Sequence, residues 1–140
     1  MLRIEARLLR AVEEHGERAY PEEGCGILLG REEEGRKVVA EILPVENRRE
    51  DAARQHRYLI PPEAVLAGEQ AAARKGLDVI GFFHSHPDHP AQPSAFDREH
   101  AWPWYSYVIT AVHGGRAAGS HAWRLLDDRS QFVEEEMSYA

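Results

Sequence analysis

Residues 81–97 read GFFHSHPDHPAQPSAFD, and the rest of the chain is interpreted outward from this stretch. A short apolar run leads into it, made of Val79, Ile80, Phe82 and Phe83. An apolar run of this length predicts a strand that is covered on both faces of a sheet. Because side chains alternate along a strand, His84 and His86 should point to one side and Ser85 to the other. The pattern therefore predicts two converging imidazoles at the end of a buried strand.

Prolines end this strand, and a helix is expected soon after them. Pro87 and Pro90 interrupt strand pairing, and Ser94 is a good helix N-cap, which puts Asp97 in the first turn of the helix. Two imidazoles and one carboxylate are a usual ligand set for catalytic zinc, whose fourth position is left to water. Ser94 and Asp97 also have the spacing of an ordinary capping box. Their combination with the two histidines favours a metal site over a helix start alone.

The full pattern resembles the JAMM (MPN-plus) metalloprotease family. That family has His-Ser-His-Pro, then a serine with seven residues between it and the second histidine, then an aspartate three positions later, and His84, His86, Ser94 and Asp97 match it. Residues 20–30, YPEEGCGILLG, are similar to its upstream motif Pro-x-Glu-x-Cys-Gly-x-Leu-x-Gly. This alignment puts Glu23 at the position of the catalytic glutamate, with Glu22 as the competing assignment. The resemblance covers Tyr20 to Asp97 with gaps, and the closing strands more loosely.

The resemblance implies a zinc-dependent hydrolase of peptide or isopeptide bonds. His84, His86 and Asp97 would bind Zn²⁺, which the ligand types favour over iron or manganese. Glu23 would act as general base and then as general acid. Ser94 would hydrogen-bond the oxygen that becomes negative in the tetrahedral intermediate.

The resemblance also implies a protein substrate. Family members cleave ubiquitin from isopeptide linkages or act on the Gly-Gly C-termini of small ubiquitin-like sulfur-carrier proteins. Only seven residues separate His86 from Ser94, which leaves no room for the added loops of larger ubiquitin-chain hydrolases. We therefore expect a substrate with a Gly-Gly tail of the sulfur-carrier type. Such a tail would suit a narrow cleft at a sheet edge, where it can add as a strand.

Composition indicates one globular domain over residues 1–140, with 43% hydrophobic and 29% charged residues. The net charge of −7 argues against a nucleic-acid partner, which needs clustered Lys and Arg. Residues 1–20 carry charges throughout, and no apolar run is long enough to span a membrane, so we expect neither a signal peptide nor a membrane partner, and a cytoplasmic location. A single cysteine excludes an internal disulfide. The oligomeric state is left open, a homodimer included.

The remaining elements predict an α/β fold with a curved mixed sheet flanked by helices, and the resemblance implies the same, with layers like those of cytidine deaminases and zinc at one sheet edge. A strand and an amphipathic helix are expected within Leu2–Glu17, with Glu13 and Glu17 outside, and the tail from Gln131 is expected to be a short helix or partly disordered. Cys25 is interpreted as a buried apolar residue, and the three tryptophans as packing residues. The other predicted strands are Cys25–Leu29, Val38–Val45 with a break near Pro44, Arg57–Ile60, Tyr105–Val112 and His121–Leu126. A helix is expected from Pro61 to Lys75. A charged turn is expected over Arg31–Lys37 and a surface loop over Asn47–Gln55.

Two alternatives belong to other classes. His84 to His89 also match the His-x-His-x-Asp-His string of metallo-β-lactamase-type hydrolases, but that fold needs further ligands downstream, and Pro90 obstructs the helix that should begin there. Only this alternative requires Asp88. The second alternative is a non-catalytic MPN-type interaction module, which has no chemical reason to keep the ligand set. A deaminase of the cytidine type is excluded, because the chain has no Pro-Cys-x-x-Cys.

Overall fold

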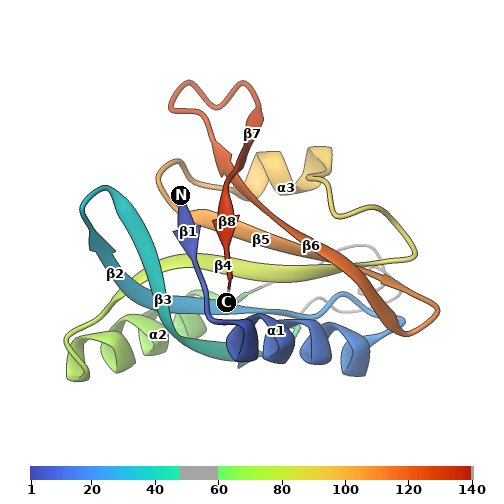
Figure 1. The fold of residues 1–140 in the computed structure, drawn as a ribbon, viewed down its shortest axis with the longest axis horizontal. Coiled ribbons are helices and arrows are strands. Elements are labelled where there is room, and N and C mark those ends of the chain that lie inside the picture. Colours follow the sequence, from blue (N-terminus) through green and yellow to red (C-terminus); the bar gives the residue numbers. More distant parts are fainter. Residues whose placement is uncertain (48–59, 140) are drawn as a thin grey trace.

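The computed structural model describes residues 1–47 and 60–139, and within them eight strands form one sheet in the order β7-β6-β5-β4-β2-β3-β1-β8 (Figure 1). Strand β4 pairs parallel to β5 and antiparallel to β2, so the sheet is mixed, as predicted. The strands are β1 (Leu2–Arg3), β2 (Cys25–Glu33), β3 (Arg36–Val45), β4 (Asp78–Pro87), β5 (Ser106–His113), β6 (Arg116–Leu125), β7 (Phe132–Glu135) and β8 (Met137–Ser138). The helices are α1 (Ala6–Ala19), α2 (Pro62–Arg74) and α3 (Ala95–His100).

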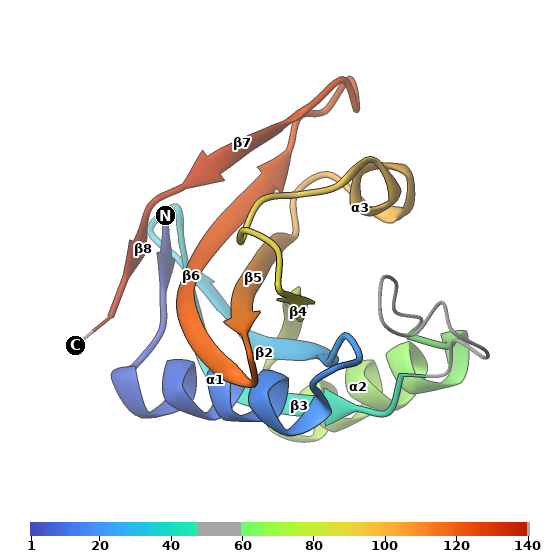
Figure 2. The same cartoon turned by 90° about the vertical axis from the view of Figure 1, so that its right-hand side faces the viewer.

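The sheet curves until it is nearly closed (Figure 2). Strands β7 and β8 stand at opposite ends of the strand order, yet only Glu136 separates them in the chain. The prediction of a helix or partial disorder from Gln131 onward is therefore wrong for β7 and β8. Their partners are β6 and β1, and β1 lies at the other end of the sequence, so the local residue pattern carries no sign of this pairing.

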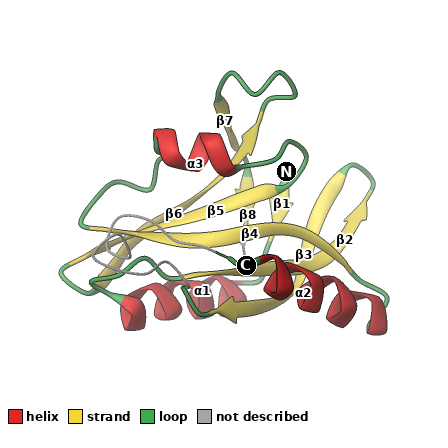
Figure 3. Ribbon diagram, turned by 180° about the vertical axis from the view of Figure 1, so that it is seen from behind, coloured by secondary structure: helices red, strands yellow, loops and turns green. Residues whose placement is uncertain are grey.

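Helices cover both faces of the sheet, which confirms the predicted layering. Leu8, Leu9 and Val12 of α1 belong to a core cluster with Leu28 and Phe83 on one face. On the other face, a second cluster joins α2 to the alternate residues of β2; its buried members are Ile27, Leu29, Ala72 and Leu77. The segments before and after α3 cover the same face over β5 and β6 (Figure 3). Their buried residues Ala91 and Ala101 pack against side chains of these two strands.

The first hairpin is longer and tighter than the sequence predicts. Strand β2 continues to Glu33, and the turn consists of Glu34 and Gly35, with φ values of 51° and 78°, instead of the whole segment Arg31–Lys37. Positive φ at both central residues is typical of a two-residue hairpin turn that follows the twist of the strands. Strand β3 runs through Pro44 without the predicted break. Its register with β1 includes only Lys37 and Val38, so Pro44 lies where no ladder bond to β1 is required.

Two glutamates of α1 that were expected outside are half-buried and bonded to the sheet. The Ser120 hydroxyl donates a hydrogen bond to Glu13 Oε2 at 3.0 Å, and the Ala117 amide donates one to Glu17 Oε2 at 2.8 Å. Strand β6 begins at Arg116, earlier than predicted, and this extension brings it within reach of α1. The polar side of α1 therefore attaches the helix to β6.

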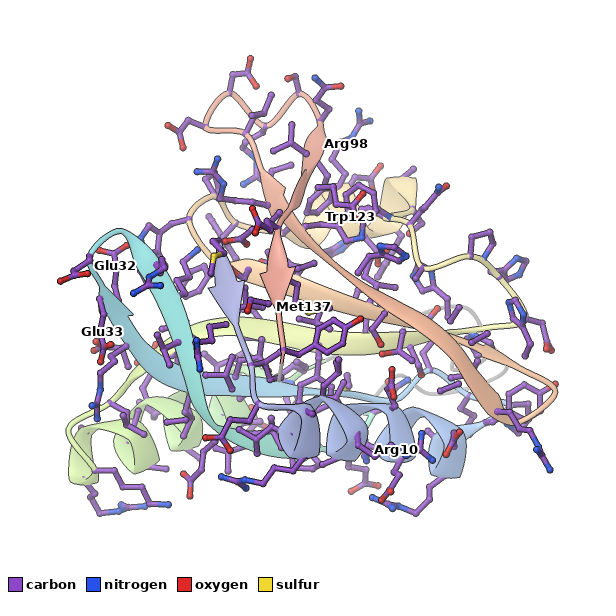
Figure 4. All side chains as sticks on the ribbon, in the orientation of Figure 1. Arg10, Glu32, Glu33, Arg98, Trp123 and Met137 are labelled. Atoms are coloured by element: carbon purple, nitrogen blue, oxygen red, sulfur yellow. The ribbon has the colours of Figure 1, made fainter. Side chains whose placement is uncertain are left out.

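The tryptophans differ from one another in exposure. Trp102 is 63% exposed and Trp104 is 43% exposed, so neither is a core residue, and Trp104 packs at the surface with its ring against Tyr105. Trp123 on β6 is half-buried, and its indole N–H donates to the Ala91 carbonyl at 3.0 Å (Figure 4). Near it, the Arg98 guanidinium of α3 donates to the Ser130 carbonyl at 3.1 Å. These two bonds attach the α3 segment to the end of β6 and the turn after it.

Some predictions fall on residues 48–59, which lie outside the described residues: most of the Asn47–Gln55 loop and most of the Arg57–Ile60 strand. The predicted helix after Pro61 is confirmed, and Gly76 follows it with a φ of 68°. Among the described residues, none of the helices has the length and apolar character that a membrane crossing requires.

Gly81 in β4 is a position where the packing tolerates no side chain. A Cβ atom there would lie 2.1 Å from the Ser106 carbonyl oxygen, a backbone atom of the neighbouring strand β5. We expect Gly81→Ala to lower the free energy of unfolding by roughly 1–3 kcal/mol or more, because β4 and β5 must separate to make room. Denaturant unfolding measures this change. Gly68→Ala in α2 is the control and should be nearly neutral, since its Cβ would meet side-chain atoms and no backbone, with Ile27 Cδ1 nearest at 3.0 Å. Equal unfolding midpoints for the two variants would contradict the prediction.

Candidate metal centre

The two histidines of the central motif lie at the end of β4 and point to the same side of the sheet, as predicted. Their Nε2 atoms are 3.2 Å apart, and both residues are buried. Ser85 between them points to the opposite face, where its Cβ lies beneath Gly16 of α1. Strand β4 has β2 on one side and β5 on the other, so the site is at the end of a central strand and not along a sheet edge. A substrate tail therefore cannot add as a strand to β4.

Asp97 reaches the histidines from the first turn of α3. Its Oδ1 lies 3.3 Å from His84 Nε2, and its Oδ2 lies 3.1 Å from His86 Nε2. The capping box is also present: the Asp97 amide donates to Ser94 Oγ at 3.0 Å, and the Ser94 amide donates to Asp97 Oδ2 at 2.9 Å. The two interpretations of Ser94 and Asp97 are thus compatible, because the cap holds the carboxylate against the imidazoles.

The spacing of these donor atoms fits a tetrahedral metal. Zinc bonds of 2.0–2.2 Å at tetrahedral angles separate ligand atoms by roughly 3.3 Å, close to the separations between His84, His86 and Asp97. The Nδ1–H group of His86 donates to the Pro90 carbonyl at 2.9 Å, which leaves its Nε2 lone pair directed at the other two side chains. The residues present therefore fit a three-ligand zinc site.

Glu23 lies on the approach to β2 and is 5% exposed. Donor atoms of Glu23, His84 and His86 all lie within 4.8 Å of one another, so Glu23 is close enough to the metal centre to be a ligand or a base. The peptide group that follows Glu23 is held at both of its polar atoms: the Gly24 amide donates to Ser85 Oγ at 2.8 Å, and the Asn47 side-chain amide donates to the Glu23 carbonyl at 3.0 Å. These bonds fix the Glu23 segment relative to β4.

A cavity of about 360 Å³ opens beside the histidines. Its lining consists of Glu23, His86, His89, Pro90, Gln92, Pro93 and Ser94. Of the two competing glutamates, this lining contains Glu23 and not Glu22. The Ser94 hydroxyl accepts the bond from the Asp97 amide, so its own hydrogen remains available for a ligand in the cavity. His89 and Gln92 line the cavity without a signal in the sequence, because their place depends on the path of the loop and not on a spacing.

The electrostatics of the cluster favour the metal-binding forms of His84 and Asp97, a neutral imidazole and a carboxylate, but not that of His86. Burial lowers the pKa of His84. Burial acts in the same direction on His86, but the hydrogen bond and charge of Asp97 outweigh it and raise the pKa of His86. Burial alone would raise the pKa of Asp97, but the charge of His84 and hydrogen bonds from both histidines hold it well below its usual range. Asp97 is therefore a carboxylate at neutral pH, as a metal ligand must be.

Cys25 and Asp88 are excluded from the cluster's chemistry on different grounds. Burial, together with the charge of Glu23, raises the pKa of the Cys25 thiol to about 12, so the thiol stays protonated, and the interpretation of Cys25 as a buried apolar residue is confirmed. The Asp88 carboxylate is directed elsewhere: it accepts hydrogen bonds from the Tyr20 hydroxyl at 2.7 Å and the Gly114 amide at 2.9 Å. This counts against the β-lactamase-type alternative, which needs Asp88 at the metal.

Comparisons with known proteins agree with the geometry. Residues 5–126 match the model of a family described as prokaryotic homologs of the JAB domain. The chain is 40% identical over 106 residues to the "Desampylase" of Haloferax volcanii, covering 74% of this chain and 70% of the relative. It is 34% identical over 117 residues to the "Probable TtuB-protein conjugate cleaving protease" of Thermus thermophilus, covering 84% of this chain and 74% of the relative.

The likeness to a solved structure supports the fold. A JAB1/MPN domain protein from Archaeoglobus fulgidus is similar with a TM-score of 0.63 at 19% identity, covering 98% of this chain and 97% of the other. At this identity the likeness concerns the fold alone. It agrees with the predicted arrangement of a curved mixed sheet and flanking helices.

Proposed function

The chain belongs to the family of prokaryotic homologs of the JAB domain, and from this premise we propose that it is a zinc-dependent isopeptidase that releases a small ubiquitin-like modifier from protein conjugates. One observation carries the proposal: the donor atoms of His84, His86 and Asp97 lie 3.1–3.3 Å apart, and a Glu23 carboxylate oxygen lies within 4.8 Å of the donor atoms of both histidines. A non-catalytic interaction module would have no use for a buried carboxylate and two buried imidazoles held at metal-ligand spacing.

The proposed residues divide into ligands and reacting groups. His84, His86 and Asp97 would hold the zinc, and zinc supplies a Lewis acid that polarises a carbonyl and lets water ionise near neutral pH. Glu23 takes a proton from the attacking water and delivers it to the leaving amine as the C–N bond breaks. The Ser94 hydroxyl donates a hydrogen bond to the carbonyl oxygen as it becomes negative, a contribution of typically ~2.7–4 kcal/mol.

The substrate class is supported by the relatives and by the shape of the site. The two curated relatives are named for removing small modifiers or for cleaving protein conjugates. Part of the cavity lining is Pro90, Gln92, Pro93 and Ser94 of the loop before α3, and a tail of small residues can approach this lining without steric conflict. A Gly-Gly C-terminus on the modifier is therefore part of the proposal.

The test uses a conjugate in which the Gly-Gly tail of a ubiquitin-like protein is joined by an isopeptide bond to a lysine of a second protein. With the zinc-loaded chain, we expect two products by intact mass: the modifier with a free C-terminal carboxylate and the second protein with a free lysine. Replacing the Gly-Gly tail by Ala-Ala should slow cleavage. Zinc bound at one ion per chain without cleavage of any such conjugate would favour the interaction module.

A further inference from the structure

Asp88 follows the second histidine by two residues and joins three separate parts of the chain. Its side chain is exposed, yet Oδ2 accepts a hydrogen bond from the Tyr20 hydroxyl at 2.7 Å and Oδ1 accepts one from the Gly114 amide at 2.9 Å. Its own amide donates to the Val112 carbonyl at 2.7 Å. Its φ is 59°, a left-handed conformation that aspartate and asparagine tolerate better than most residues.

One of these partners, Tyr20, lies at the start of the segment that carries Glu23. Tyr20 is the C-cap residue of α1, three positions before Glu23, and Gly114 lies in the turn between β5 and β6. The Tyr20 ring also packs on that turn, 3.8 Å from where a Cβ of Gly115 would be. Asp88 thus attaches the start of the segment that carries Glu23 to the end of β4, which carries His86.

The segment has a second attachment on the other side of Glu23. There the Gly24 amide donates to Ser85 Oγ at 2.8 Å, and the Ser85 amide donates to the Gly24 carbonyl at 3.0 Å. With one attachment before Glu23 and one after it, the backbone that carries the glutamate is held to β4 at both ends. Hydrogen bonds to an ionised carboxylate are stronger than neutral ones, which makes the Asp88 attachment effective despite its exposure.

We propose that Asp88 is a positioning residue: by binding the Tyr20 hydroxyl and the Gly114 amide, it holds the segment that carries Glu23 against the histidine strand. This inference rests on the proposed isopeptidase function and assigns a role to a residue that the metal motif leaves unused. The Asp88 carboxylate is not part of the cavity lining, although its neighbour His89 is, and its hydrogen bonds go to Tyr20 and Gly114. The proposed effect therefore passes through the placement of Glu23.

The first test measures turnover. Asp88→Ala and Tyr20→Phe should each lower kcat, because small displacements of a catalytic group slow the reaction strongly. The expected decrease in kcat for Asp88→Ala is about 10- to 100-fold. Metal content and KM should stay at the wild-type values. Asp88→Asn keeps an acceptor for Gly114 and can donate to the Tyr20 oxygen, so it should recover most of kcat. Asp128→Ala is the matched control, since Asp128 is also exposed and accepts from a turn amide, Ser130 N at 2.9 Å, far along the chain.

A double-mutant comparison separates positioning from general stabilisation. If Asp88 acts through Glu23, adding Asp88→Ala to Glu23→Gln should cause no further loss of kcat. A loss that multiplies with that of Glu23→Gln, or an unchanged kcat in Asp88→Ala alone, would overturn the proposal.

Amide hydrogen exchange tests the attachment without any substrate. In Asp88→Ala we expect the Gly24 amide to exchange about tenfold faster, because its segment is released, while core amides of β5 keep their wild-type rates. Unchanged Gly24 exchange would reject the proposal even if the wild type proves to cleave conjugates. Conversely, faster Gly24 exchange in a chain that cleaves nothing would retain the attachment and reject the proposed function.

Discussion

Replacing Glu23 by glutamine is expected to lower kcat by about 10²- to 10⁴-fold, the usual contribution of a positioned general base. Glutamine has almost the shape of glutamate but cannot accept a proton at neutral pH. The Glu23 backbone is held by bonds at Gly24 N and at its own carbonyl, so the variant should keep its fold. Metal content and KM should stay close to wild type, because the proposed ligands are untouched. Steady-state cleavage of the conjugate measures kcat and KM, and elemental analysis measures the metal content.

Glu22→Gln is the matched control for this prediction. Glu22 is adjacent in sequence, but the cavity lining contains Glu23 instead. We expect Glu22→Gln to keep wild-type turnover. Loss of turnover in Glu22→Gln, with activity retained in Glu23→Gln, would mean that the register between this chain and the family motif is off by one. A Glu23→Gln variant that also loses its metal would instead make Glu23 a ligand.

Local patterns were sufficient to predict the elements that carry the site. The apolar run before His84 and the alternation of side chains predict β4 and the shared direction of the two imidazoles. The N-cap residue Ser94 predicts where α3 begins, and the first turn of that helix puts Asp97 within reach of the strand end. Each of these inferences depends on residues only a few positions apart, where backbone geometry is decisive.

Contacts between distant segments could not be predicted in the same way. The pairing of β8 with β1 depends on backbone hydrogen bonds that any residue other than proline can make, so the tail carries no recognisable signal. The bond between Asp88 and Tyr20 joins residues 68 positions apart, and neither has a pattern that predicts the other. The position of the site at the end of a central strand likewise follows from strand order, which the sequence does not show.

If His84 is a metal ligand, replacing it by alanine should remove the metal. We expect about one zinc per wild-type chain by elemental analysis, and nearly none in the variant, because a two-ligand site cannot complete the coordination that zinc requires. His84 is 1% exposed, so circular dichroism must confirm that the variant is folded. Metal content retained in a folded His84→Ala would contradict the assignment, and a wild type that takes up no zinc would favour the interaction module.

Two further variants separate the roles of Asp97 in the cap and in the metal site. Asp97→Asn can still accept the bond from the Ser94 amide, now 2.9 Å from Oδ2, but it no longer offers a charged ligand. Ser94→Ala removes the hydroxyl that accepts from the Asp97 amide and leaves the carboxylate in place. We therefore expect Asp97→Asn to be folded and depleted of zinc, and Ser94→Ala to hold zinc with a lower kcat. The reverse result, with zinc lost from Ser94→Ala and kept by Asp97→Asn, would reduce Asp97 to a helix cap.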